Sequence, residues 1–501
     1  MSSASLHNVL GLAWDNSYAR LPQRFFAPAR PAIVAAPRLL AINDPLAREL
    51  GMEPAALHTP DAIAIFAGNQ IAPGSEPIAL AYAGHQFGHF VPQLGDGRAI
   101  LLGELITRSG ARVDLQLKGS GRTAFSRRGD GRAAIGPVLR EFLVSEAMHA
   151  LGVPTTRALA AVATGETVLR ERPVPGAVLT RVAASHIRVG TFEYFAAHQD
   201  VEALQLLASY AMARHYPQAR EAEQPIRTFL ELVLQRQARL IAQWLHVGFI
   251  HGVMNTDNMA ISGETIDYGP CAFLDAYHPE TVFSFIDQQG RYAYLQQPEI
   301  ALWNLARFAE TLLPLLERET GSQAAAVDAA SRVLEGFATA FAAAHLEGLR
   351  AKLGLTTAQE EDAALAQDLL QAMAANQADY TSTFRLLAEA ALGPQHEGAL
   401  SALFRNPAEF SAWATRWRTR LQQEPADPTG RAQAMRCVNP AYIPRNHLVE
   451  AALAAAEHDN MAPFEALLQV IRHPFAEQPG REHYALPARP EQRVRHTFCG
   501  T

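Results

Sequence analysis

The residues best suited to chemistry lie in one short stretch, HGVMNTDNMAISGETIDYG, at positions 251–269. It contains an amide and a carboxylate, Asn258 and Asp267, nine positions apart. A turn signal at Gly263 and Glu264 lies between them and predicts a two-stranded hairpin. Magnesium is a hard ion that prefers oxygen ligands and usually takes few of them from protein. We therefore expect Asn258 and Asp267 to converge on one divalent cation.

One carboxylate in this stretch is a candidate proton acceptor. A hydroxyl that attacks a phosphate needs a nearby group to take its proton. Phosphotransferases of the protein-kinase type carry a catalytic aspartate at the position that Val253 occupies here. The nearest acid is Asp257, beside Asn258. Asp257 is therefore either the base of a rearranged site or a structural residue in a catalytically inactive protein.

A lysine at the end of a predicted strand could bind a triphosphate. Lys118 closes RVDLQLK, and kinases orient such a lysine with a glutamate from the next helix. The helix predicted over 137–151 offers two, Glu141 and Glu146. On a helical wheel Glu146 lies among the apolar residues and Glu141 points nearly opposite. Periodicity alone therefore favours Glu146, and the choice stays open at this point.

Two arginines follow in positions suited to phosphate binding. Arg181 ends the strand AVLTRVA, and Arg188 follows in the segment that leads into the helical part of the chain. The arginine fork binds phosphate through two parallel hydrogen bonds. The alternative is a pair of surface arginines in salt bridges. The phosphate interpretation is favoured by further arginines nearby, at positions 98, 122, 127, 128 and 132.

The elements that must position these residues change character along the chain. Two strands joined at Ser109 and Gly110 precede a glycine- and arginine-rich loop at 119–136, and a helix follows. Further strands are predicted with tight turns at Thr164-Gly165 and Pro175-Gly176. Beyond residue 200 long apolar repeats predict helices almost throughout. The pattern predicts an α+β protein with a small sheet-rich lobe and a large helical lobe.

Composition limits the class of protein. The 501 residues are 49% hydrophobic and 19% charged, as in ordinary globular proteins, and the net charge of −7 provides no basic field for nucleic acid. Three cysteines (Cys271, Cys437 and Cys499) are too few for a disulfide framework. No stretch reaches the roughly 20 apolar residues of a membrane helix. We expect a soluble, cytoplasmic protein that binds neither nucleic acid nor membranes.

One further motif, HQFGH at 85–89, has two histidines at a spacing that metal-binding helices use. It lacks the glutamate of a zinc protease, and Gly88 disfavours a helix there. We therefore predict no zinc site.

Several blocks, taken together and in order, resemble the SelO (selenoprotein O, or YdiU) family of protein adenylyltransferases, which have a protein-kinase-like fold. The blocks span most of the chain: YAGHQFG (82–88), QLGDGRA (93–99), QLKGSG (116–121), GDGRA (129–133), REFLVSEAMHALGVPTTRAL (140–159), HGVMNTDNM (251–259), IDYGP (266–270), QPEIALWNLAR (297–307) and NPAYIPRNH (439–447).

The resemblance implies that ATP, the co-substrate, binds in reversed orientation and that AMP is transferred to Ser, Thr or Tyr of protein substrates. Asp257 matches the proton acceptor, and Asn258 and Asp267 match the ligands of Mg²⁺ or Mn²⁺. Glu141 matches the partner of the lysine, against the helical wheel. The matching nucleotide contacts are Gly95, Gly97, Arg98, Lys118, Asp130, Gly131, Arg181, Arg188 and Asp267.

The family also carries selenocysteine or cysteine near the C-terminus, and Cys499 matches that position. The resemblance implies a regulatory disulfide, for which Cys271 is the candidate partner, and an unpaired tail thiol is the alternative. We predict an N-terminal extension (1–80), a kinase-like N-lobe (81–195), a helical C-lobe (196–480) with the catalytic hairpin at 251–270, and a tail (481–501). A monomeric adenylyltransferase is the leading interpretation; a kinase-like phosphotransferase and a non-catalytic ATP-binding pseudokinase are the alternatives.

Overall fold

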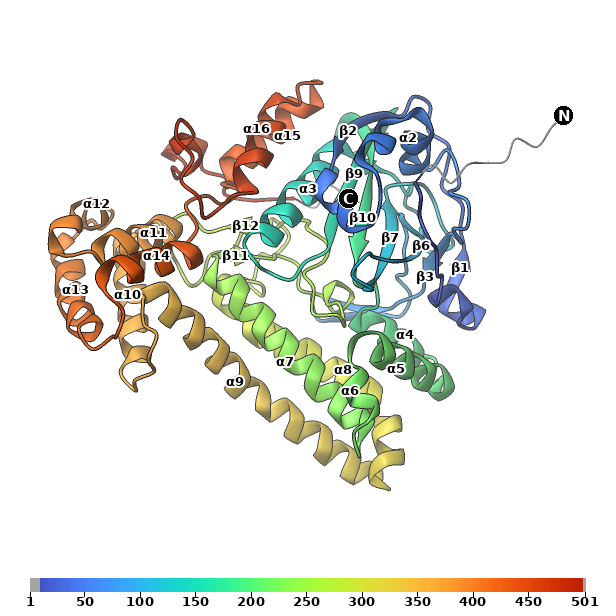
Figure 1. The fold of residues 1–501 in the computed structure, drawn as a ribbon. Helices are drawn as coiled ribbons and strands as arrows, with labels where there is room; N and C mark the ends of the chain where they lie inside the picture. The colour runs from blue at the N-terminus through green and yellow to red at the C-terminus, as the bar shows by residue number, and fades with distance from the viewer. Residues whose placement is uncertain (1–9, 499–501) are drawn as a thin grey trace.

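The N-terminal part of the protein is built on one antiparallel sheet, seen in a computed structural model that describes residues 10–498 (Figure 1). Along the sheet the strand order is β1-β3-β6-β7-β10-β9-β2, and β8 pairs with β10. The strands are β1 (Phe26–Pro28), β2 (Arg38–Ile42), β3 (Ile78–Leu80), β6 (Ala99–Ile106), β7 (Arg112–Lys118), β8 (Ala133–Ala134), β9 (Arg157–Leu169) and β10 (Pro173–Ala183).

The first 80 residues join this sheet instead of forming a core of their own. Strands β1 and β2 are its two edges. Helices α1 (Asp44–Glu49) and α2 (Pro60–Ala67) bury their apolar side chains in one cluster with residues of β6, β7, β9 and β10. The short elements of this segment complete the hydrophobic core of a neighbouring unit, as an extension that packs on the rest of the chain would.

The predicted hairpin before Lys118 is confirmed. Strands β6 and β7 pair in antiparallel register from Ala99 opposite Lys118 to Ile106 opposite Arg112. Gly110, with φ +84°, makes the turn. Side chains alternate along β7, so those of Asp114, Gln116 and Lys118 share one face of the strand.

The predicted turns at Thr164-Gly165 and Pro175-Gly176 are wrong, because both lie inside strands β9 and β10. These strands form one long hairpin with an irregularity opposite Gly176, where Ala163 and Thr167 of β9 face Ala177 and Pro175 of β10. Strands β2, β7 and β8 pair with the outer edges of this hairpin and keep the chain extended through the glycines.

Helix α3 (Ile135–Ala150) begins two residues before the predicted start at Pro137. It packs between the sheet on one side and helices α15 (Asn446–Glu457) and α16 (Ala462–Ile471) on the other. Nearly every side chain is therefore buried, including Glu141 and Glu146. A helix buried on all sides has no solvent-facing stripe, so the helical wheel could not distinguish the two glutamates.

The rest of the described chain is mainly helical, as predicted. Helices α7, α8 and α9 pack side by side, a second group (α10–α14) lies at one end of them, and α15 and α16 return to the sheet (Figure 1). No helix of residues 10–498 is long and apolar enough to cross a membrane. The helices are α4 (Val189–Ala197), α5 (Val201–His215), α6 (Pro217–Arg220), α7 (Pro225–His246), α8 (Gln297–Thr320), α9 (Gln323–Leu353), α10 (Asp362–Asn376), α11 (Tyr380–Ala390), α12 (Gly398–Ser401), α13 (Pro407–Leu421) and α14 (Pro428–Val438).

The hairpin predicted within residues 251–270 is wrong. This segment is a loop between two short paired strands, β11 (Phe249–Ile250) and β12 (Ala272–Phe273), with one 3-10 turn (Thr256–Asn258). Ala260 bridges to Arg188 and Thr265 bridges to Thr155. The two halves of the predicted hairpin thus pair with distant segments instead of with each other, which a local turn signal cannot reveal.

Candidate active site

A cavity of about 380 Å³ lies between the sheet and the loop at 251–271. This volume is within the range of small-molecule sites. Its wall contains most of the site residues predicted from the sequence: Gly97, Arg98, Lys118, Glu141, Arg181, Arg188, Asp257, Asn258 and Asp267. Strand β7, strand β10, helix α3 and the loop each contribute to it, so residues far apart in sequence meet here.

Asp267 is the centre of the charges in this cavity. Its Oδ1 lies 2.7 Å from Lys118 Nζ and 2.6 Å from Arg181 Nη1, and its Oδ2 accepts a hydrogen bond from Arg188. Burial alone would raise the pKa of Asp267, but the charges of Arg188, Lys118 and Arg181 hold this pKa well below its usual range. Asp267 is therefore ionised at neutral pH.

Lys118 contacts Glu141 and not Glu146. The distance from Lys118 Nζ to Glu141 Oε2 is 2.6 Å, and Arg181 Nη1 lies 3.1 Å from the other oxygen of Glu141. Glu146 binds Arg157 of β9 instead, at 2.7 and 2.9 Å. The pairing matches the one that the family resemblance implies.

Arg181 and Arg188 are buried, which excludes the alternative of two surface arginines. Arg181 is 1% exposed, and Gln116 Oε1 accepts hydrogen bonds from its Nε and Nη2 at 3.2 and 2.5 Å. Arg188 donates to the backbone oxygen of Asp257 at 2.6 Å and lies over the ring of Tyr82 at 4.8 Å. Both guanidinium groups are thus held in fixed positions beside the cavity.

Asp257 has the environment of a proton acceptor. It is 8% exposed, and its Oδ2 accepts a hydrogen bond of 3.3 Å from Gln86. Its Oδ1 is buried and has no hydrogen-bond partner within the described part of the chain. Burial raises the pKa of Asp257 to about 6. A base with this pKa is ionised at neutral pH and still binds a proton well.

Two oxygen-bearing side chains are suited to a divalent cation. Asn258 and Asp267 both line the cavity, and Asn258 donates through Nδ2 to Val253 O at 2.9 Å. Between residues 10 and 498 there is no group of three or more His, Cys, Asp or Glu side chains that could hold a metal. The donor set fits Mg²⁺ or Mn²⁺, which take their remaining ligands from phosphate and water.

Three predicted nucleotide contacts lie outside the cavity wall. Gly95, with φ +66°, packs under the ring of Phe125. Asp130 has a side chain that is 47% exposed and pairs with Arg170 at 2.8 Å. Gly131 packs against the backbone of the same loop. The structure therefore brings Gly97 and Arg98 to the cavity, but not Gly95, Asp130 or Gly131.

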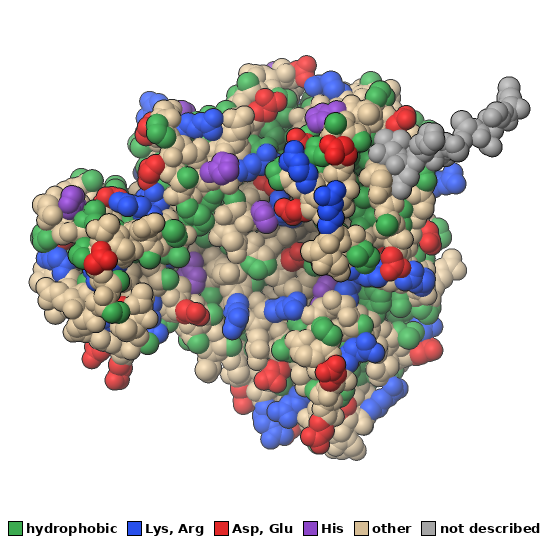
Figure 2. All heavy atoms as spheres, viewed as in Figure 1, with side chains coloured by type: hydrophobic (Ala, Val, Ile, Leu, Met, Phe, Trp, Pro, Cys, Tyr) green, Lys and Arg blue, Asp and Glu red, His purple; other side chains and the backbone are tan. Residues whose placement is uncertain are grey.

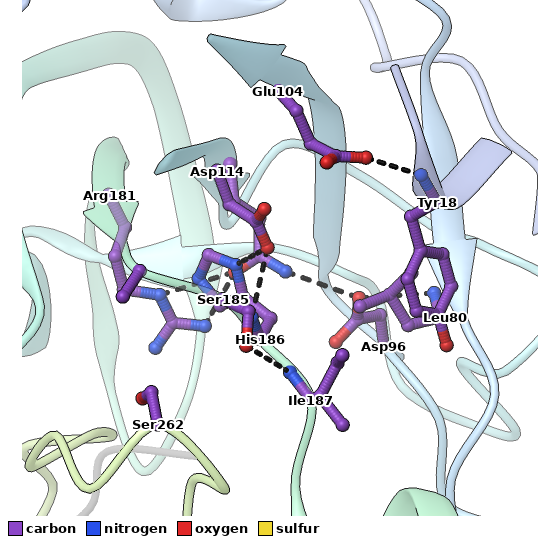
Figure 3. Close-up of polar contacts among 12 residues, drawn as sticks. Tyr18, Leu80, Asp96, Glu104, Asp114, Arg181, Ser185, His186, Ile187 and Ser262 are labelled. Carbon is purple, nitrogen blue, oxygen red and sulfur yellow. Dashed lines mark hydrogen bonds and ion pairs between the residues drawn. The ribbon is translucent and has the colours of Figure 1, made fainter. Parts of the chain in front are cut away.

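The cavity also contains residues that the sequence reasoning missed, chiefly Asp96, Tyr82 and Gln86. Asp96 Oδ2 accepts hydrogen bonds from Leu80 N at 3.1 Å and from the side chain of Gln116 at 3.2 Å (Figure 3). Burial raises the pKa of Asp96 to about 6. The sequence contained one signal for these residues, because each of them lies within one of the blocks shared with the SelO family.

The described end of the C-terminal tail lies beside the loop that carries Asp267. Thr497 donates from its backbone to Phe283 O at 2.7 Å and from its hydroxyl to Pro270 O at 2.6 Å. Cys271, the next residue after Pro270, is buried. Cys499 lies outside the described residues, so the predicted pairing of the two cysteines is not addressed by the structure.

Comparison with known proteins shows the class of this chain. The family described as Protein adenylyltransferase SelO matches residues 8–472. A Protein nucleotidyltransferase YdiU from Rhodopseudomonas palustris (strain BisB5) is 60% identical over 489 residues, which cover 97% of this chain and 99% of the relative. Its counterpart from Nitrobacter hamburgensis is 57% identical over 499 residues, which cover 100% of this chain and 98% of that relative.

These matches show that the chain is of the protein nucleotidyltransferase class. The chain belongs to the SelO family of protein adenylyltransferases. The resemblance found in the sequence blocks is thereby confirmed, and ATP is the implied co-substrate.

Proposed function

We propose that the chain transfers AMP from ATP to hydroxyl groups of Ser, Thr or Tyr in other proteins and releases pyrophosphate. The main supporting observation is the arrangement of charges in the cavity. Three cations surround Asp267, while Asp257 and Asp96 each have a buried oxygen without a hydrogen-bond partner in residues 10–498, and of these two Asp257 lies on the same loop as Asn258 and Asp267. Val253, at the usual position of a kinase base, has no group that could accept a proton.

Lys118, Arg181 and Arg188 would hold the β- and γ-phosphates, which become the leaving group. Asp267 now neutralises these cations, so a bound triphosphate would compete for them and free the carboxylate for a metal ion. Asn258 and Asp267 would then hold Mg²⁺ or Mn²⁺. The ion would neutralise negative charge on the phosphate oxygens.

Asp257 would take the proton from the acceptor hydroxyl. The hydroxyl oxygen forms a bond to the α-phosphorus, the bond from that phosphorus to the bridging oxygen of the β-phosphate breaks, and pyrophosphate leaves. The proton passes to the carboxylate of Asp257. The reversed orientation of ATP explains why a base is needed at 257 and not at 253, since the α-phosphate must face the acceptor.

The remaining sequence predictions are retained as part of this proposal. Gly97 and Arg98, in the cavity wall, would contact the nucleotide, and Gly95, Asp130 and Gly131, which lie outside that wall, are proposed contacts on the family resemblance alone. The proposed architecture is the two-lobed protein-kinase type with the domain boundaries given above. The pair of Lys118 and Glu141, which joins the sheet to a helix, supports this assignment.

We also propose a cytoplasmic monomer that binds neither nucleic acid nor membranes. Acidic and basic side chains are interspersed over the face seen in Figure 2. Together with the net charge of −7, this distribution gives no general attraction for polyanions.

A disulfide between Cys271 and Cys499 is a regulatory hypothesis. The contact between Thr497 and Pro270 supports it, because it holds the described end of the tail near Cys271. Unchanged activity and unchanged mobility on a non-reducing gel after addition of reductant would contradict it.

The transfer reaction is tested with ATP labelled at either the α- or the γ-phosphate and a mixture of candidate proteins. Label from the α-position alone supports adenylylation. Label from the γ-position alone indicates a phosphotransferase, and no transfer of either label indicates a non-catalytic protein.

A further inference from the structure

The motif HQFGH, at residues 85–89, lies on a hairpin at the edge of the cavity and not on a helix. Strands β4 (Gly84–Gln86) and β5 (His89–Val91) pair with each other, and Gln86 is opposite His89. The two histidines therefore sit on different strands. His85 Nδ1 contacts the carboxylate of Glu193 on α4. One ring nitrogen of His85 is therefore bound within the protein, and the motif is not a pair of free metal-binding histidines.

The hairpin holds the loop that carries the proposed proton acceptor. His85 N donates to Thr256 Oγ1 at 2.7 Å, and Phe87 N donates to Asn255 Oδ1 at 3.0 Å. Between them, Gln86 Nε2 donates to Asp257 Oδ2 at 3.3 Å. Three consecutive hairpin residues thus bind three consecutive loop residues, at positions 255–257.

Further contacts make this attachment rigid. Glu193 binds His85 with one carboxylate oxygen and Thr256 with the other. Tyr292 donates its hydroxyl to Asn255 Oδ1 at 2.7 Å, and its ring lies 5.1 Å from that of Phe87. Glu193 and Tyr292, which belong to neither the hairpin nor the loop at 255–257, therefore anchor the two ends of this attachment.

Gly84 is the position of closest approach. A Cβ added there would lie 2.6 Å from Asp257 Oδ1 and 2.9 Å from Asp257 Cβ, which is too close without movement of the aspartate. The backbone of Gly84 is not left-handed, so its conformation does not itself require glycine. The carboxylate of Asp257 is the group that excludes a side chain at this position.

We infer that the β4–β5 hairpin is a positioning element for Asp257, in which Gln86 holds Oδ2 and Gly84 leaves room for Oδ1. The inference rests on the proposed function, in which Asp257 accepts the proton. Gln86 at Oδ2 and the close approach of Gly84 at Oδ1 together fix the orientation of the carboxylate at the edge of the cavity. The hydrogen bond of the Gln86 side chain is to Asp257, and the ion pairs of the three cations are to Glu141 and Asp267, so we expect the hairpin to act on the chemical step more than on ATP affinity.

The test uses Gln86→Leu, which removes the donor, and Gly84→Ala, which displaces Asp257. Both variants are expected to lower kcat for AMP transfer about tenfold or more, with the Kd for ATP and the melting temperature nearly unchanged. Gln371→Leu and Gly336→Ala are matched controls at exposed helix positions, and they should match the wild type. Gln86→Met is the alternative if Gln86→Leu does not fold.

A double-mutant cycle with Asp257→Asn distinguishes positioning from a general structural effect. Asp257→Asn alone should lower kcat at least about a hundredfold. If Gln86 acts through Asp257, Gln86→Leu has no further effect in that background. An equal loss of kcat in both backgrounds, or no loss in the wild-type background, would overturn the inference. Retention of kcat by Asp257→Asn would instead overturn the assignment of the base.

Discussion

Two buried clusters of charge lie on the same face of strand β7, and they have opposite properties. The cavity cluster consists of Lys118, Glu141, Arg181, Arg188 and Asp267, at the end of the strand near Lys118. The sealed cluster lies around Asp114 at the other end, and its members are Glu104, Arg112, Asp114, His186 and Arg214.

The sealed cluster has a donor for each of its carboxylate oxygens. Arg214 lies 2.6 Å from Asp114 and 3.1 Å from Glu104. His186 donates to Asp114 from its backbone and its ring, both at 2.9 Å (Figure 3). The backbone of Tyr18 donates to the second oxygen of Glu104. Burial lowers the pKa of His186 to about 4, so its ring is neutral at pH 7.

The cavity cluster instead has three cations against two carboxylates. It also borders Asp96 and Asp257, each of which has one buried oxygen without a hydrogen-bond partner in residues 10–498. Buried charge alone therefore does not indicate function. Three cations gathered around one carboxylate beside a cavity, together with acceptors that lack partners, are what allow a polyanionic ligand and a proton to bind.

The largest effect should come from Asp267→Ala, which removes a proposed metal ligand and the counter-charge of three cations. We expect kcat/KM for AMP transfer to fall about a thousandfold or more, because charge on the phosphates is no longer neutralised. Transfer of α-labelled phosphate is the measurement. Asp328→Ala, in an exposed pair on α9, is the control. Activity within tenfold of wild type in Asp267→Ala would contradict the metal assignment.

The second prediction tests the sealed cluster. Arg214→Met leaves Glu104 and Asp114 without their shared partner and should lower the free energy of unfolding by about 3–5 kcal/mol. Denaturant unfolding measures this loss, and the folded variant should bind ATP with unchanged Kd. Arg332→Met, at an exposed ion pair, should change the unfolding free energy by less than about 1 kcal/mol. A large loss of ATP affinity in Arg214→Met would show that the two clusters are not functionally separate.

The third prediction compares the two glutamates of α3. Glu141→Gln weakens the orientation of Lys118 and Arg181, so kcat/KM for ATP should fall about tenfold to a hundredfold. Glu146→Gln disrupts a pair with Arg157 outside the cavity and should affect stability more than kcat/KM. Steady-state kinetics and thermal melting of both variants measure the difference. The reverse pattern would favour the arrangement that the helical wheel predicted.

The smallest effect is expected from pH. The pKa of Asp257 is raised to about 6, and the base must be ionised to act, so transfer should rise with pH and reach half its maximum near pH 6. Between pH 7.5 and pH 5 the rate should fall about tenfold. The pKa of Asp267 is held well below its usual range, so Asp267 stays ionised over this interval and does not contribute to the change in rate. A rate independent of pH between 5 and 7.5 would argue against Asp257 as the base.

Much of the site could be predicted because side-chain chemistry and secondary-structure preference depend on the local sequence. Two strand-like runs joined at Ser109 and Gly110 identified β6 and β7, and Pro137 lies near the start of α3. Residue type and spacing identified Lys118 and Asp267, and the family resemblance identified Glu141; the structure brings these three residues together. Gln86 was missed because its contact with Asp257 joins residues 171 positions apart. No local pattern reports such a contact.

The types of residue, the order of most elements and the family follow from the amino-acid sequence alone. Which of these residues meet depends on the packing of the folded chain. Glu141 and Glu146 are equally buried, and only the neighbours of each, Lys118 and Arg157, distinguish them. The predicted hairpin at 251–270 became a loop because Ala260 and Thr265 pair with distant segments. Local signals set what a segment prefers, whereas hydrogen bonds and charges supplied by distant residues determine its final conformation.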